Sequence, residues 1–317
     1  MTSFLNEELA PIALFVYKRP YHTTKVLNAL AKCKESANSI LYIFSDGPSH
    51  DMCQEDIFLV SEVRRIINSE NRFARTIISM SERNQGCAKA ITEGINFVVN
   101  KHGKIIVLED DIIVSHVFLE YMNFCLNYFE NTFEISSINA YSHNIFTMPE
   151  YYFLKGGDCW GWGTWKRGWD LINLNAAQLY DNYIDTGLLE EWETGNLVST
   201  LKSAISSPQN IWDIQWSLSL FVNDKLSIWP GKSYVYNIGY DGTGTNIILD
   251  VYKHFILKPR LNHKVNKKYI RELEIEENIV CRKKLIQFHS RRTSKFKKGV
   301  FMLVISILRK MKLLRLT

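Results

Sequence analysis

Apolar and polar positions alternate regularly over the first 140 residues. Four short apolar runs have the length of buried strands, and they span 11–18, 40–46, 74–80 and 104–111. Between them lie amphipathic segments with helical spacing, which follow Pro20 and span 55–68 and 88–101. This alternation predicts an α/β fold of the Rossmann-like type, with a mostly parallel central sheet and helices on both faces. Ligands of such sheets bind at the carboxyl ends of the strands.

The regular pattern stops near residue 140, where an aromatic and glycine-rich block at 156–169 begins. Mixed helical and loop sequence follows to about residue 280. Neither an internal repeat nor a low-complexity linker separates the two parts, so we expect residues 1–140 and 141–280 to be halves of one continuous domain.

The last part of the chain, 281–317, has a different charge from the rest. Residues 282–317 hold 12 of the 38 lysines and arginines and no acid, which leaves 26 basic against 33 acidic residues before them. Ten apolar residues, GVFMLVISIL at 299–308, lie between basic clusters. This length suits a helix lying on an anionic membrane surface rather than crossing it. A helix docked on the body is the alternative, and the body has no basic face or motif that predicts nucleic acid binding.

The six cysteines show no CxxC pair and no signal peptide precedes them, so we interpret them as reduced cytosolic thiols. Together with the tail, this predicts a cytoplasmic protein held peripherally at the inner face of the cell membrane.

Three acids, Glu109, Asp110 and Asp111, directly follow the fourth apolar run. Buried carboxylates are unfavourable unless water or a cation meets them, and Mg²⁺ or Mn²⁺ prefers oxygen ligands that a substrate's phosphates can complete. The alternative is that the acids cap a following helix. Asp46, after the second run, could accept from a nucleobase or ribose, or be an Asx-turn residue. Arg19, after the first run, could bind phosphate or simply lie on the surface.

These residues occur in a combination that resembles a known family. Lys-Arg-Pro after the first run, Ser-Asp-Gly after the second, ERNQGCAKAITEGI at 82–95 and VLEDD at 107–111 are similar to the GT-A glycosyltransferases. The resemblance is to bacterial cell-surface polysaccharide transferases related to N-acetylglucosaminyltransferase I. It continues through CWGWGTWKRGW at 159–169 and IWDIQW at 211–216.

The resemblance implies a role for each acid and for the region beyond them. Asp111 would be the direct metal ligand, Glu109 and Asp110 would contact the donor's ribose and sugar, Asp46 would meet the uracil, and Arg19 would lie near the nucleotide. Residues 1–140 would then bind the nucleotide sugar and residues 141–280 the acceptor, a glycan or lipid-linked glycan of lipopolysaccharide or capsule synthesis. The expected cofactors are Mn²⁺ or Mg²⁺ and a UDP-linked donor.

Two further predictions concern the second half. Trp160 and Trp162 could stack on sugar faces, although aromatic residues at this spacing also suit a core. In the related transferases the base of the inverting transfer follows the Trp-Gly block in a Trp-Asp context, so the resemblance implies this role for Asp213. The alternative is an N-cap of a helix starting near Ile214. One departure from the family is Asn246, where a His is expected.

Two other functions compete with sugar transfer. A sugar nucleotidyltransferase usually has a glycine-rich loop after its first strand, and FVYKRPYH at 15–22 contains no glycine. A non-catalytic glycan-binding module would leave the three clustered acids without a role.

Overall fold

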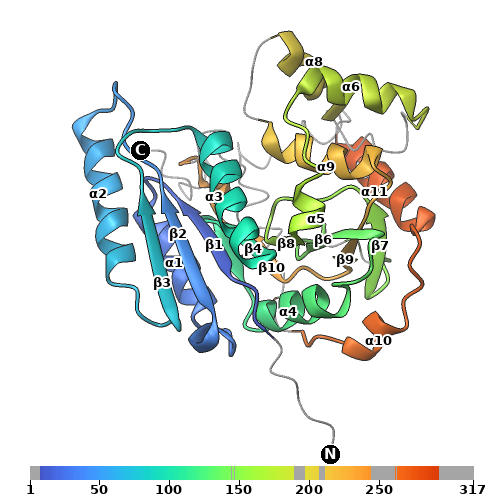
Figure 1. Cartoon of the computed structure of the whole chain (residues 1–317), viewed down its shortest axis with the longest axis horizontal. Coiled ribbons are helices and arrows are strands. Elements are labelled where there is room, and N and C mark those ends of the chain that lie inside the picture. Colours follow the sequence, from blue (N-terminus) through green and yellow to red (C-terminus); the bar gives the residue numbers. More distant parts are fainter. Residues whose placement is uncertain are drawn as a thin grey trace, which may run out of the picture.

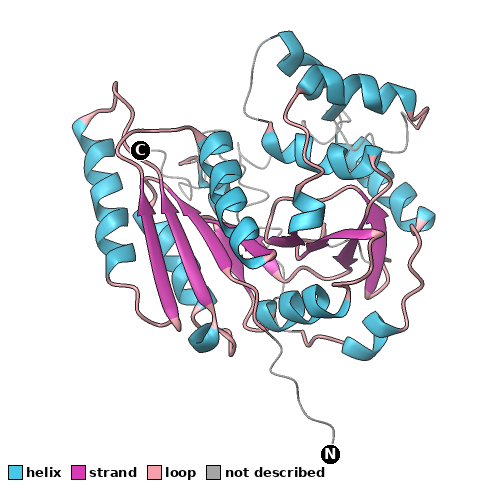
Figure 2. Cartoon of the chain, viewed as in Figure 1, coloured by secondary structure: helices cyan, strands magenta, loops and turns pink. Residues whose placement is uncertain are grey.

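The computed structural model describes residues 8–143, 145, 147–188, 197–206, 211–243, 261 and 263–292. These residues form an eight-stranded sheet with helices on both faces (Figures 1 and 2). The strand order is β3-β2-β1-β4-β8-β6-β9-β7, and only β7 and β8 run against the others. The predicted α/β class with a mostly parallel sheet is confirmed.

The first half of the sheet follows the predicted rhythm. Its parallel strands are β1 (Ile12–Val16), β2 (Ile40–Ser45), β3 (Arg75–Met80) and β4 (Lys104–Glu109). All five residues of β1 are buried, as expected of a central strand that helices cover on both faces. The carboxyl ends of these strands therefore meet at one edge of the sheet.

Three helices cover this half, and alternate residues of each strand face them. Helices α1 (Pro20–Leu30) and α2 (Gln54–Asn68) pack on one face with Leu14 of β1, and α3 (Cys87–His102) packs on the other with Phe15. Each fully buried aliphatic or aromatic side chain contributes about 1.5–3 kcal/mol. Gly103, with φ of +76°, ends α3 directly before β4.

The second half is built from strands distant in sequence. Strand β8 (Trp162–Trp165) inserts antiparallel between β4 and β6 (Ile135–Asn139), and β9 (Leu226–Pro230) and β7 (Tyr151–Lys155) complete the sheet. Two short strands, β5 (Ile112–Val114) and β10 (Val235–Asn237), form a separate pair. The helices of this half are α4 (Phe118–Tyr128), α5 (Lys166–Trp169), α6 (Ala176–Asp185), α8 (Leu197–Ser206) and α9 (Trp212–Val222).

The C-terminal elements that the structure describes are α10 (Lys267–Arg271) and α11 (Ile279–Arg292). Residue 281, the predicted start of the tail, lies inside α11. Cys281 and Leu285 are buried against Trp229 of β9, so this helix is docked on the body. Residues 293–317, most of the predicted tail, lie outside the described residues. Among the described helices, none has both the length and the apolar character needed to span a membrane.

Candidate functional site

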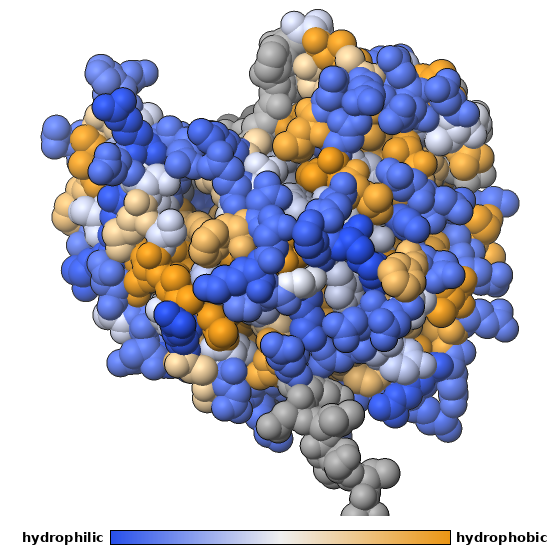
Figure 3. All heavy atoms as spheres, viewed as in Figure 1, coloured by the Kyte–Doolittle hydropathy of each residue, from blue (hydrophilic) through white to orange (hydrophobic). Residues whose placement is uncertain are grey.

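The three consecutive acids lie at the carboxyl edge of the sheet. Strand β4 ends at Glu109, Asp110 and Asp111 form a turn, and β5 begins at Ile112. No helix follows the acids directly, so the helix-capping alternative is wrong. This edge lies between α2 and α8 in Figure 1, and the outline of the molecule dips there in Figure 3.

Arg19 joins the end of β1 to these acids. Its Nη2 atom is ion-paired with Asp110 and lies 3.0 Å from Oδ2 of Asp111. All three side chains are largely buried, with 17%, 5% and 10% of their surface exposed. Burial opposes the charge of Arg19, but the two carboxylates outweigh it and raise the pKa of the guanidinium. The structure thus places Arg19 beside Asp110 and Asp111, and its role near the nucleotide stays a prediction.

A segment from the second half encloses Asp111. The N–H of Ile238 donates to the Asp111 carbonyl at 2.9 Å. At Gly239 a Cβ atom would overlap Oδ2 of Asp111, so glycine lets the backbone approach this carboxylate without displacing it. Residues 237–241, NIGYD, therefore form a wall of the site. Asn246, the departure from the family pattern, lies outside the described residues.

Asp213 reaches the same group of acids from α9. The helix begins at Trp212 with Ile211 as its N-cap, so Asp213 lies in the first turn and the N-cap alternative is wrong. Burial raises the pKa of Asp213, and nearby backbone N–H groups partly offset this. Burial, followed by the charges of Asp111, Asp110 and Asp213, raises the pKa of Glu109 well above its usual value. The base role of Asp213 stays a prediction, in a position that suits it.

Two residues of the site went unassigned from the sequence. Burial, together with the charge of Asp213, raises the pKa of Asp158 to about 6, although the N–H groups of Trp160 and Cys159 oppose this. Burial also raises the pKa of the neighbouring Cys159 thiol, with contributions from Asp213, Asp158 and Glu109. Both residues lie in the turn between β7 and β8, at the start of the Trp-Gly block. In the sequence, the only indication of their role is that an acid, Asp158, directly precedes this block.

Asp46 is held in a turn at the same edge. Its Oδ1 accepts the N–H groups of Gly47 at 2.8 Å and Gln85 at 2.9 Å. These bonds join the loop after β2 to the loop before α3. The Asx-turn alternative is wrong, because that turn needs an N–H donor two residues on and Pro48 has none. The contact with uracil stays a prediction.

The two tryptophans predicted to stack on sugars differ. Trp162 has no exposed surface, and its ring lies 5.9 Å from Trp169 and 5.0 Å from Trp216, centroid to centroid. Its predicted sugar contact is wrong because the side chain belongs to the core under α9. Trp160 is only partly buried, with its ring edge-on to Tyr141 and Tyr240. Its role at a sugar stays a prediction.

The donor set of this edge suits a divalent cation only in part. In the described residues there is no group of three or more acidic, His or Cys side chains arranged to hold a metal ion. The guanidinium of Arg19 instead brings a positive charge to Asp110 and Asp111. Carboxylate oxygens beside a cationic group fit Mg²⁺ or Mn²⁺ when a substrate's phosphates supply the remaining ligands.

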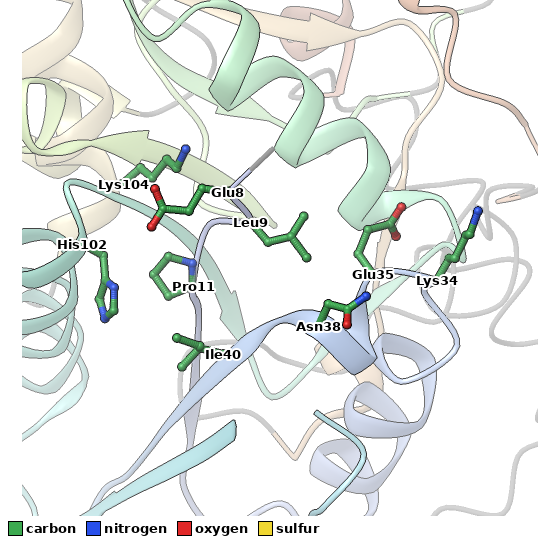
Figure 4. A pocket seen from close by; sticks show the side chains of 9 residues that line it. All are labelled: Glu8, Leu9, Pro11, Lys34, Glu35, Asn38, Ile40, His102 and Lys104. Carbon is green, nitrogen blue, oxygen red and sulfur yellow. The ribbon is translucent and has the colours of Figure 1, made fainter. Parts of the chain in front are cut away.

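A cavity at the opposite edge of the sheet differs from this site. It has a volume of about 660 Å³ and lies beside Pro11, Ile40 and Lys104, at the amino ends of β1, β2 and β4 (Figure 4). Its charged lining is mixed, with Glu8 and Glu35 near Lys34 and Lys104. The acids of β4 project from the other end of the strands, so this cavity is not part of the candidate site.

Comparisons with known proteins give partial structural likenesses. No family model and no curated protein matches this chain. TarS of S. aureus is 12% identical, over 73% of this chain and 37% of its own, with a TM-score of 0.40. Glucosyl-3-phosphoglycerate synthase of Mycobacterium tuberculosis, in complex with Mn²⁺, uridine diphosphate and glucosyl-3-phosphoglycerate, is 9% identical, over 51% of this chain and 58% of its own, with a TM-score of 0.31. The chain therefore spans less than two thirds of either protein's length.

Proposed function

We propose that this chain is a glycosyltransferase that moves a sugar from a nucleotide donor, UDP-linked, to a hydroxyl of a glycan or lipid-linked acceptor. The observation that carries the proposal is the group of acids at the end of β4, which faces Arg19, the N-cap of α1, and Asp213 of α9. A parallel sheet binds its ligand at this edge. Donor-binding and proton-accepting groups thus come from the two halves of the chain and meet there.

The donor would bind on the β1–β4 side. A nucleoside diphosphate brings negative charge to a cleft that already contains Glu109, Asp110 and Asp111, so it needs a cation between itself and the acids. We assign Asp111 as the residue that would hold Mn²⁺ or Mg²⁺, with Glu109 and Asp110 toward the ribose and sugar. When bound, the cation would stabilise the charge that develops on the departing diphosphate. Arg19 supplies donors for the same phosphates.

The acceptor would bind on the α9 side. Asp213 would take the proton of the attacking hydroxyl, which requires a carboxylate within reach of that hydroxyl. Burial raises the pKa of Asp213, which makes its carboxylate a stronger proton acceptor than an exposed aspartate. A single base opposite the donor corresponds to an inverting transfer. Trp160, which is only partly buried, would meet a sugar face.

The direct test is a screen of nucleotide sugars with Mn²⁺ and glycan acceptors, read as release of the nucleoside diphosphate. A glycosyltransferase releases UDP, whereas a sugar nucleotidyltransferase releases or consumes pyrophosphate. A glycan-binding module does neither. Absence of nucleotide release from every donor, with and without acceptor, would contradict the proposal.

For the acceptor, we propose a membrane-associated glycolipid of lipopolysaccharide or capsule synthesis, reached at the inner membrane face through the basic residues of 282–317 other than Arg282, which is buried against Glu277. Lys and Arg near an anionic leaflet contribute about 1 kcal/mol each. The test is a shortened chain that ends at Arg292, the last residue of α11. This end point keeps the whole helix, which packs on the body through Leu285. This chain should lose binding to vesicles of anionic lipid and keep UDP binding. Equal vesicle binding by the full and shortened chains would refute the membrane contact.

A further inference from the structure

His22 is a buried polar side chain of α1 that lies next to the acids of β4. Only 5% of its side chain is exposed, and its Nε2 atom lies 3.2 Å from Oδ2 of Asp241. Asp241 is itself held, because its Oδ1 accepts from the N–H of Thr243 at 3.0 Å and from the Thr243 hydroxyl at 2.7 Å. A carboxylate oxygen accepts but does not donate, so this contact favours a proton on Nε2 and restrains the imidazole.

The same residue is close to Asp111. The charge of His22 contributes to lowering the pKa of the Asp111 carboxyl, as does that of Arg19, although burial raises this pKa overall. His22 follows Arg19 by three residues, a spacing that places side chains on one side of a helix start. Asp241 belongs to the 237–241 wall that encloses Asp111. Arg19, His22 and the wall thus converge on one carboxylate.

We propose that His22 is a second contact for the diphosphate of the donor, held in place by Asp241. This inference rests on the proposed function and adds a residue to its donor site. Arg19 is shared between two carboxylates, so one guanidinium serves both the acids and the incoming phosphates. In its protonated form the imidazole, one turn away, donates from Nε2 to Asp241 and has a second N–H, on Nδ1, for a phosphate oxygen. A carboxylate bonded to one ring nitrogen fixes the orientation of a histidine, as it does in metal sites, and leaves the other nitrogen to meet a ligand.

The alternative is a structural role, in which His22 only connects α1 to the wall. The two roles make different predictions for ligands with and without phosphate. A structural histidine affects the whole cleft, so its loss weakens the binding of uridine, UDP and inorganic pyrophosphate alike. A phosphate contact affects only the ligands that carry phosphate.

The experiment measures the binding of uridine, UDP and inorganic pyrophosphate to the full chain with Mn²⁺, by calorimetry or by competition. His22→Gln should raise the Kd of UDP and of pyrophosphate about 5- to 30-fold and leave that of uridine within about twofold. Asp241→Asn should raise the same two constants by a smaller factor. His102→Gln is the matched control, since His102 contacts the Tyr42 hydroxyl at the other edge of the sheet and should change none of the three.

Other results would contradict either the His22 contact or the proposed function. Unchanged UDP and pyrophosphate binding in His22→Gln overturns the His22 contact, and so does an equal loss for uridine, which indicates a structural role. A loss of Mn²⁺ affinity without any ligand would place His22 on the metal instead. Wild-type protein that binds pyrophosphate through His22 but neither binds nor turns over UDP sugars overturns the proposed function alone. Wild-type protein that binds neither UDP nor pyrophosphate overturns both.

Discussion

Two buried arginines of this molecule have different surroundings. Arg282 of α11 has 6% of its side chain exposed and faces one acid, Glu277, with Nη2 and Nε at 2.5 Å and 3.0 Å from Oε1. Its Nη2 also donates to the carbonyl of Lys155, and the N–H of Lys155 donates to Glu277. One positive charge meets one negative charge, and their polar atoms are bonded to each other and to the edge strand β7.

Arg19 faces more acids than it can neutralise. It is paired with Asp110 and Asp111, and the charges of Glu109 and Asp213 act on the same cluster. Like charges held together out of water reduce stability unless a ligand joins them. Arg282 is therefore matched by one acid, so losing either partner would leave an unpaired buried charge. The unmatched acids around Arg19 are the expected property of a site completed by a cation and a substrate.

The largest effect should come from Asp111→Asn, which keeps the shape of the side chain under Gly239 and removes its charge. We expect turnover of the donor to fall by roughly 10³-fold, equivalent to about 4 kcal/mol, because the cation would lose its assigned ligand. Steady-state nucleotide release with Mn²⁺ measures this. Asp170→Asn, at an exposed pair with Lys166, is the control and should keep wild-type turnover. If metal-dependent activity persists in Asp111→Asn, Asp111 is not the metal ligand. The acids around Arg19 would then not differ from the Arg282 pair in the way proposed.

A second effect on turnover should follow from Asp213→Asn. We expect transfer to slow by about 10²-fold or more, with UDP binding unchanged, because the amide cannot accept the proton of the acceptor hydroxyl. Comparing UDP affinity with the rate of acceptor-dependent release separates the two steps. Wild-type transfer by this variant would exclude Asp213 as the base.

Breaking the Arg282–Glu277 pair should change the stability of the protein rather than its activity. Glu277→Ala leaves Arg282 buried without its acid, so we expect the free energy of unfolding to fall by about 3–5 kcal/mol. Chemical denaturation measures it. The folded variant should retain the wild-type affinity for UDP, since α11 lies away from the β4 acids. A loss of UDP affinity without a loss of stability would contradict this assignment.

The smallest effect concerns acid. Because burial raises the pKa of Asp158 to about 6 from an ordinary value of 3.8, the folded state binds this proton more tightly than the unfolded state. The charged carboxylate of Asp158 therefore lowers the free energy of unfolding. This loss is fully present above pH 6 and disappears as the pH falls toward 4. The free energy of unfolding is measured in EDTA for wild-type protein and for Asp158→Asn at pH 7 and pH 5. On going to pH 5, the wild-type value should rise relative to that of the variant by about 1 kcal/mol. An identical pH response of the two proteins would exclude a buried Asp158 carboxyl.

The parallel half could be predicted from its sequence because β1, β2 and β4 are largely buried and its strands alternate with amphipathic helices. The acids of β4 and Arg19 followed from that pattern, since each ends a strand at the same edge. In the second half the neighbours of β8 are β4 and β6, which no local pattern reveals. There, the helix of Asp213 starts two residues earlier than expected, and Trp162 packs in the core.

Single side chains without a pattern were harder to predict. His22 and Asp241 are far apart in sequence, so their contact depends on how α1 meets the end of β10. Asp158 and Cys159 become site residues only because the turn between β7 and β8 folds toward α9. The close approach of Gly239 to Asp111 depends likewise on tertiary structure, although glycine is the residue type that permits it.

The position of Cys159 among the acids has a practical consequence for spectroscopy. Maleimides and methanethiosulfonates react with the thiolate, and the high pKa of Cys159 keeps its thiol protonated near neutral pH. Cys53 and Cys87 are exposed, and they stand at the starts of α2 and α3, on either side of β2 at the ligand-binding edge. Paired spin labels or fluorophores could therefore be attached at these two natural positions, and the distance between them would report whether this rim moves when a ligand arrives.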